Sequence, residues 1–135
     1  MDDHKLRLNE FQVNLYNKIL DDLFIKNISI NKVSTGQGTS VALIYLISKL
    51  KVKTLFITQK QLFEHHKNII NKFLHEDNDL NIDFVSIPNN VNYEDYELII
   101  IDDLNTFAPQ TKQLEIFNKI SELNGIKIII TQSDY

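Results

Sequence analysis

The sequence predicts a three-layer α/β fold, in which helices cover both faces of a mainly parallel sheet of about five strands. Strand-like and helix-like segments alternate along the chain. The two strongest strand candidates, residues 98–101 and 126–130, have no continuous polar face. Strands that are apolar on both sides are typical of parallel sheets covered by helices. The 135 residues suffice for one such core, so we assign residues 1–135 to a single domain.

The first part of the chain predicts two helices separated by a strand and a tight loop. Apolar side chains recur at helical spacing, which predicts a helix over residues 9–24. Residues 28–34 alternate as a strand does, and glycines follow at positions 36 and 38. The apolar run after Ser40 predicts a buried helix that ends near Leu50.

The rest of the chain continues this alternation. A β-branched and aromatic run predicts a strand over residues 54–58, and helical periodicity returns over residues 62–73. A helix is predicted over residues 111–123, with Gly125 suited to its C-terminal cap. The three remaining strands are predicted at residues 82–87, 97–102 and 126–131.

Composition excludes several classes of protein. With 43% apolar and 24% charged residues the chain is of the globular type, and no apolar run approaches the roughly 20 residues that span a bilayer. A formal charge of −4 argues against general affinity for nucleic acid or anionic membranes. The chain has no Cys and begins without a targeting signal. We therefore expect an intracellular, cytoplasmic protein, in the host cytoplasm if it is viral, with no membrane partner.

Three polar segments follow predicted strands, and the carboxyl ends of parallel strands are where such sheets bind ligands. Glycines before a helix can turn backbone N–H groups toward a phosphate, to which the helix N-terminus adds partial positive charge. Of two adjacent carboxylates, one can hold Mg²⁺ while the other orients an attacking water. The segments are Thr35, Gly36, Gln37, Gly38, Thr39 and Ser40 after the first strand, Asp102 and Asp103 after the fourth, and Thr131, Gln132 and Ser133 after the fifth.

Each segment alone has a simpler explanation. Two glycines before a helix are more often only a turn, and an Asp pair after a strand is often a turn with a helix cap. Polar residues near a C-terminus are mostly solvated. Their order along the chain, each after a strand and with helices between them, favours a shared nucleotide site.

These segments resemble the motifs of two families of P-loop NTPase. The chain is similar to the N-terminal RecA-like lobe of superfamily 2 helicases and to the ATPase domain of the large terminases of tailed phages. Leu8, Phe11 and Gln12 resemble the element that reads adenine in those families. The other matching stretches are residues 34–40 for the Walker A loop, 55–62 for motif Ia, 98–103 for Walker B and 130–133 for motif III.

The resemblance implies ATP and Mg²⁺ as ligands. It implies a role for Ser40 and Asp102 in binding the metal, and for Asp103 as the catalytic residue that positions water. The residues implied in nucleotide binding are Gln12, Thr35, Gly36, Gln37, Gly38, Thr39 and Ser40, and those implied in coupling are Thr131, Gln132 and Ser133.

Two departures from the family pattern bear on activity. Thr39 stands where the Walker A lysine is expected, and Asp103 where the second Walker B carboxylate is usually Glu. Loss of the lysine charge should slow phosphoryl transfer by orders of magnitude. The sequence therefore predicts ATP binding with weak or absent hydrolysis. Lys32 is either a substitute for the lysine or, as is commoner for such a residue, a solvated charge at a strand end.

Two further hypotheses stay open. The chain is a pseudo-ATPase that serves as a protein-binding or assembly module without nucleotide, or it is one lobe of a longer protein. We expect it to act within a nucleic-acid-processing protein complex, with contacts through apolar groups such as Phe107 or Phe63. Nucleic acid is expected to reach it through partners and to bind the isolated chain weakly. Residues 49–53, which hold three lysines, either touch a nucleic-acid backbone or form a solvated turn.

Two predictions concern geometry. The resemblance implies that the strand ending at Thr131 lies between those ending at Ser34 and Asp102. His65 and His66 point about 100° apart on a helix, which is poor geometry for binding one metal ion. We therefore predict that both histidines lie at the surface or its boundary.

Overall fold

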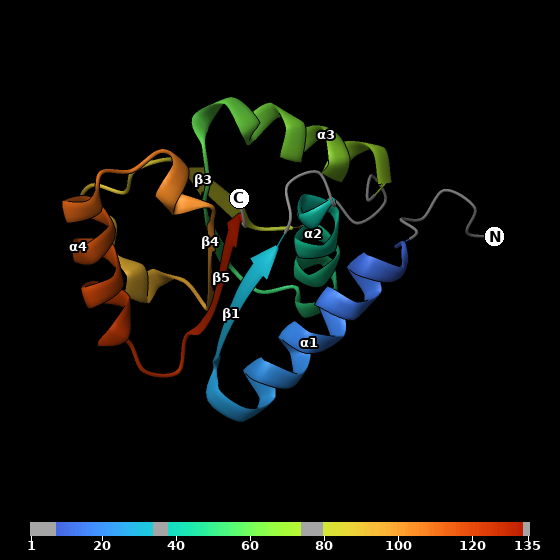
Figure 1. The fold of residues 1–135 in the computed structure, drawn as a ribbon, viewed down its shortest axis with the longest axis horizontal. Coiled ribbons are helices and arrows are strands. Elements are labelled where there is room, and N and C mark those ends of the chain that lie inside the picture. The colour runs from blue at the N-terminus through green and yellow to red at the C-terminus, as the bar shows by residue number, and fades with distance from the viewer. Residues whose placement is uncertain (1–7, 34–37, 74–79, 134–135) are drawn as a thin grey trace.

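Residues 8–33, 38–73 and 80–133 are described by the computed structural model, and five parallel strands form its one sheet, in the order β1-β5-β4-β2-β3. Figure 1 views this sheet from the side of its edge strand β1. The predicted fold class is confirmed, and the last strand lies between the first and the fourth as predicted. The strands are β1 (Ile28–Val33), β2 (Thr54–Ile57), β3 (Ile82–Val85), β4 (Leu98–Asp102) and β5 (Lys127–Ser133).

Helices cover the two faces of the sheet unequally. The helices α1 (Glu10–Lys26), α2 (Thr39–Leu50) and α3 (Phe63–Phe73) lie on one face, and α4 (Gln110–Ser121) lies on the other (Figure 1). Alternate residues of the central strands enter two apolar cores, one on each side, because successive strand side chains point to opposite faces. None of the helices in the described ranges combines the length and apolar character needed to cross a membrane.

α1 begins at a capping box. The Asn9 side chain accepts a hydrogen bond from the Gln12 backbone N–H at 2.8 Å, and the Gln12 side chain accepts one from the Asn9 N–H at 2.9 Å. Each bond satisfies a backbone N–H group that the first turn of a helix leaves without a partner. This arrangement fixes Gln12 in the first turn, facing the interior.

Most element boundaries differ from the prediction by one or two residues, and two of these differences concern predicted roles of residues. β5 continues to Ser133, because it pairs with β1 on one side and β4 on the other, and its register with β1 runs to the last residue of that strand. The polar residues 131–133 therefore lie within the strand and not after it. α4 is capped by Glu122, while Gly125 lies in the following turn with φ +78°.

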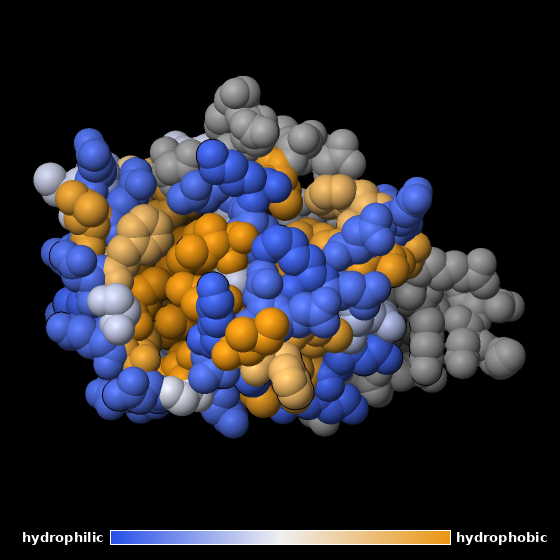
Figure 2. Space-filling model, turned by 60° about the horizontal axis from the view of Figure 1, so that its bottom comes forward, coloured by the Kyte–Doolittle hydropathy of each residue, from blue (hydrophilic) through white to orange (hydrophobic). Residues whose placement is uncertain are grey.

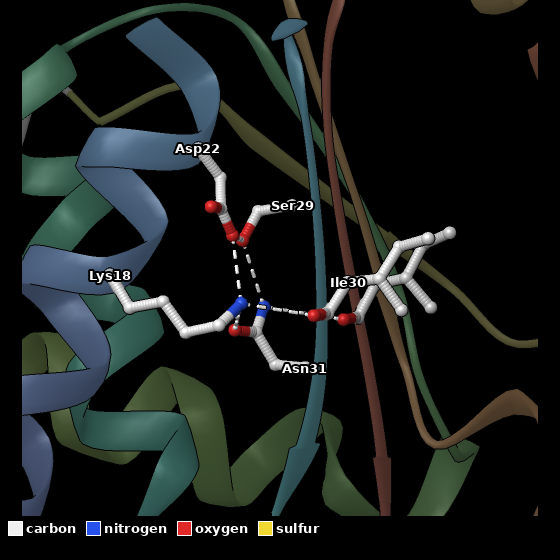
Figure 3. A network of polar contacts seen from close by, with 6 residues as sticks. Lys18, Asp22, Ser29, Ile30 and Asn31 are labelled. Atoms are coloured by element: carbon white, nitrogen blue, oxygen red, sulfur yellow. Dashed lines mark hydrogen bonds and ion pairs between the residues drawn. The ribbon is translucent and has the colours of Figure 1, made fainter. Parts of the chain in front are cut away.

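The edge strand β1 is polar on the face that α1 covers. Figure 3 shows Lys18 reaching from α1 to this strand, where its Nζ donates to Asn31 Oδ1 at 2.8 Å and to the Ile30 carbonyl at 3.0 Å. Nζ also pairs with Asp22 at 2.8 Å, and the hydrogen bonds from Lys18 and Ser29 lower the pKa of this carboxyl. A lysine bound to an edge carbonyl hinders the addition of another strand there.

One histidine of α3 is fully buried, contrary to the prediction. His65 is exposed, but the ring of His66 is 0% exposed and stacks against Phe84, with centroids 5.7 Å apart. It also lies 4.9 Å from the ring of Phe56, and neither of its nitrogens has a hydrogen-bond partner among the described residues. Burial lowers the pKa of His66 to about 4, with a smaller contribution from His65. The imidazole is therefore held neutral in an aromatic environment.

We expect His66→Leu to stabilise the fold. The substitution removes two buried polar atoms without partners, and each such atom costs about 1–3 kcal/mol. The wild-type protein should also lose stability as pH falls from 6.5 toward 4, since only the unfolded chain takes up a proton there. This loss amounts to about 3 kcal/mol. Urea unfolding at several pH values measures both effects.

The exposed neighbour provides the control. His65→Leu should change the unfolding free energy by less than about 0.5 kcal/mol, as is usual at the surface. Equal effects of the two substitutions, or a wild-type stability that does not fall below pH 6.5, would contradict the buried position of His66.

Candidate functional site

The carboxyl ends of β1, β5 and β4 meet at one edge of the sheet. Asp102, the last residue of β4, lies opposite Thr131 of β5 in the strand register. Thr131 in turn lies opposite Asn31 of β1, and the loop after β1 leads to the start of α2 at Thr39. Strand order alone thus brings the Walker B-like and motif III-like segments side by side, next to the strand that precedes the Walker A-like loop.

The carboxylate of Asp102 is held by two threonines from neighbouring strands. Thr131 Oγ1 donates to Asp102 Oδ1 at 2.7 Å, and Thr58 Oγ1 donates to Oδ2 at 3.3 Å. Both threonines are fully buried. Sequence analysis did not identify Thr58, although a threonine directly after an apolar strand, at the edge where ligands bind, is a signal that could have identified it.

Opposing influences act on the ionisation of Asp102. Burial raises the pKa of this carboxyl, and the nearby charge of Asp103 adds to the rise. The hydrogen bonds from Thr131 and Thr58 act in the other direction, because they stabilise the ionised form. A cation beside this carboxylate would relieve the cost of its burial.

Asp103 leaves the strand in a tight turn. Its φ is +61°, in the left-handed region, and it precedes the short 3₁₀ helix η4 (Leu104–Thr106). The Asp103 N–H donates to the Thr131 carbonyl at 2.8 Å, and its own carbonyl accepts from Thr106 Oγ1 at 2.8 Å. Gln59 Nε2 donates to the same Thr106 hydroxyl at 2.8 Å. The turn is therefore fixed to β5 and to the segment that follows β2.

Gly38 and Gln12 join the N-termini of α1 and α2. Gln12 Nε2 donates to the Gly38 carbonyl at 3.0 Å. Gly38 has φ +78°, and a Cβ there would collide with the amide nitrogen of Gln12. Only glycine fits this position without strain. Gln12 is buried and positions the start of α2, while its role in adenine binding stays a prediction.

The other predicted site residues are placed as follows. Thr39 and Ser40 form the first turn of α2 and are half-buried. Gln132 lines a groove beside α4, away from Thr131 and Asp102, and Ser133 is the last residue of β5. In the described ranges no cluster of three or more His, Cys, Asp or Glu could hold a metal ion. The predicted Thr35, Gly36 and Gln37 lie outside the described residues.

The three lysines before β2 lie at the opposite end of that strand from Thr58. Lys49 Nζ lies 5.0 Å from the ring centroid of Tyr45, and Lys53 Nζ lies 5.1 Å from that of Tyr96. Lys51 caps the C-terminus of α2 with φ +52°. These charges are therefore separated from the candidate site by the length of the strand.

Comparison with solved structures identifies the architecture. A structure described as the Sulfolobus solfataricus SWI2/SNF2 ATPase core in complex with dsDNA matches with a TM-score of 0.70 and 17% sequence identity. The match covers 96% of this chain and 32% of that one. The chain has the fold of a RecA-like helicase lobe. It spans about a third of the length of that helicase-type core, and at this identity the likeness shows the fold alone. No protein-family model and no curated protein matches the sequence.

We expect Thr131→Val to weaken the fold in a pH-dependent way. Folding raises the pKa of Asp102, so the ionised carboxyl destabilises the folded state. This destabilisation grows as pH rises above the pKa of Asp102 in the unfolded chain and through its pKa in the folded chain. Without the 2.7 Å bond the destabilisation should grow by about 1–2 kcal/mol at pH 7 and be smaller near pH 4, where the carboxyl binds a proton. Unfolding curves at the two pH values measure the difference.

Two other threonines complete the test. Thr58→Val should act in the same sense but less, because its bond to Asp102 is longer. Thr54→Val is the control, since this buried hydroxyl donates to the Val52 carbonyl and should cost the same at both pH values. A pH-independent deficit in Thr131→Val would show that the bond does not stabilise an ionised Asp102.

Proposed function

We propose that this chain is a nucleotide-binding domain that binds ATP with Mg²⁺ and hydrolyses it slowly or not at all. The observation that carries the proposal is the carboxylate of Asp102, half-buried and held by Thr131 and Thr58 at the edge where β1, β5 and β4 end. A structural role alone gives no reason to keep a charge whose burial is unfavourable. Its fold supports the same proposal, because it is that of a helicase-type ATPase lobe.

The donor set fits a magnesium ion that keeps most of its ligands from phosphate and water. An ionised carboxylate can accept about four hydrogen bonds or metal contacts, and the two threonines use only part of that capacity. Ser40, in the first turn of α2, would supply a hydroxyl, and Asp102 a carboxylate oxygen. When bound, Mg²⁺ supplies positive charge that offsets the charge of the phosphates.

Slow hydrolysis follows from two features of the sequence. Thr39 provides no cation where phosphoryl transfer develops charge. Arg7 is the only arginine of the sequence and lies outside the described residues, so none of the described residues supplies a guanidinium to the phosphates. Asp103 would position water with its side chain. Hydrogen bonds at its N–H and its carbonyl hold its backbone in the turn.

Calorimetric titration with ATP, with and without Mg²⁺, tests the proposal directly. We expect saturable binding that weakens when Mg²⁺ is removed. Asp102→Asn should abolish the dependence on Mg²⁺ while keeping or raising the melting temperature at pH 7, because it removes a buried charge. An absence of binding under both conditions would refute the proposal and favour an assembly module without nucleotide.

Restoring the family lysine is a second test. We expect Thr39→Lys to tighten ATP binding about tenfold or more, since it adds a charge-assisted contact to the phosphates. Thr39→Met is the matched control, a long side chain at the same position without charge. Equal affinity of the two variants would mean that the first turn of α2 is not directed at the phosphates.

We further propose that the chain acts in a nucleic-acid-processing protein complex and binds bare nucleic acid weakly. The SWI2/SNF2 core with the similar fold was solved with dsDNA. This chain carries a net charge of −4, and its lysines at 49, 51 and 53 lie away from the candidate site. Phe107 and Phe63, predicted as contact points, are half-buried in the structure.

A mobility-shift titration at low and moderate salt measures this. Backbone affinity comes mainly from phosphate neutralisation, so we expect weak binding that disappears as salt is raised. Tight binding by the isolated chain would contradict the expectation. In that case the joint replacement of Lys49, Lys51 and Lys53 by Gln would show whether this cluster is responsible.

A further inference from the structure

An apolar groove lies between α4 and the edge strand β1. Figure 2, in which the lower end of Figure 1 comes forward, shows it as a hollow of orange surface beside α4. Its volume is about 290 Å³, and none of the described residues that line it is charged. We call it the α4–β1 groove. Its apolar lining residues are Ile28, Ile30, Phe117, Ile120, Ile128 and Ile130.

The groove exists because α4 is the only α-helix that the described residues place on its face of the sheet. The opposite face is covered by three helices, whereas on this face Ile30 of β1 remains 61% exposed. Leu114 of α4 is 56% exposed and lies three residues, about one helical turn, before Phe117. Contiguous exposed apolar surface, as in this groove, is a feature of interaction sites.

A complementary apolar projection stands at one end of the same groove. Phe24 and Ile25, in the last turn of α1, are 89% and 75% exposed. Only Lys26 and Asn27 separate them from Ile28, which lines the groove. An exposed Phe–Ile pair in a helix that buries Leu15, Ile19 and Leu23 on its other side is not needed for packing within the chain.

We propose that a second copy of this chain occupies the α4–β1 groove, with Phe24 and Ile25 of each copy inserted into the groove of the other. Projection and groove are neighbours on one surface, so a two-fold axis beside them forms both contacts at once and closes the assembly as a dimer. Phe24 and Ile25 are already exposed and the groove is already open, so this docking requires no conformational change.

Charges at the end of the groove agree with this occupant. A second hollow adjoins the groove and shares Ile28, Ile120, Ser121 and Ile128 with it. Among the described residues that line this hollow, Lys26 alone is charged. The last two turns of α1, which would approach it from the other copy, carry the exposed Asp21 beside Phe24 and Ile25. Lys26 is also the last residue of α1, so each copy carries one charge of each sign, Lys26 and Asp21, beside its projection.

Strand pairing between two β1 edges is a poorer alternative. The Ile30 carbonyl, which points outward from the sheet, already accepts a hydrogen bond from Lys18. α1 also packs on β1, so two β1 strands at the usual spacing of about 4.8 Å would force their α1 helices together. The contact through side chains avoids both obstacles.

Sedimentation equilibrium of the full chain, from low micromolar to sub-millimolar concentration, tests the proposal. We expect a reversible monomer–dimer equilibrium without larger species. Phe24→Ser and Ile30→Lys should each raise the dimer dissociation constant about tenfold or more. Both side chains are exposed, so circular dichroism should show unchanged folding. Val13→Ser is the matched control, an apolar residue of α1 that is 40% exposed at the other end of the helix.

Mixing the two variants provides the sharper result. In a dimer of one Phe24→Ser copy and one Ile30→Lys copy, one of the two contacts is intact, so the mixture should associate more strongly than either variant alone. A monomeric wild-type protein throughout the concentration range would overturn the proposal. So would a dimer that Val13→Ser weakens and Phe24→Ser does not, or a mixture no stronger than its components.

Discussion

β5 is hydrogen-bonded to β1 on one side and to β4 on the other, and the candidate site depends on this position. Because parallel strands end at the same edge, the register of β5 with β4 places Thr131 opposite Asp102. The same strand holds the next turn, since the Thr131 carbonyl accepts from the Asp103 N–H. Thr131, near the carboxyl end of an interior strand, thus orients the Walker B-like carboxylate through its side chain and the following turn through its backbone.

Asp102 differs from the surrounding core because burial of its charge is unfavourable and is only partly offset by hydrogen bonds. β4 buries Leu98, Ile99, Ile100 and Ile101 completely and then ends in a carboxylate whose pKa is raised by burial. Two hydroxyls reduce the cost of the charge without removing it. An apolar or amide side chain in place of Asp102 would make the folded state more stable. Strain and unfavourable burial of this kind concentrate at functional sites, which is the physical reason for assigning a ligand to this edge.

Apolar periodicity predicted the strand and helix order correctly, because burial on two faces determines which residues those segments contain. It failed where a polar residue occupies an interior position. His66 was expected near the surface, yet its ring fills a space between Phe56 and Phe84. Thr58 was missed for the same reason, since its partner Asp102 lies 44 positions away and no local pattern links them. Long-range polar contacts depend on the register of the sheet, which a single sequence does not encode in any short segment.

The unequal covering of the sheet places the two proposed functions, nucleotide binding and dimer formation, on opposite faces. Thr131 and Asp102 lie on the face of the sheet that three helices cover, because their strand positions alternate with the apolar residues of the other face. Gln132, one position further along β5, therefore points to the α4–β1 groove. A partner copy in that groove would lie against β5 and β1, the strands that lead to the candidate site. Association through Phe24 and Ile25 would then change the surroundings of Gln132 without touching Asp102, so the two properties can be separated by substitution.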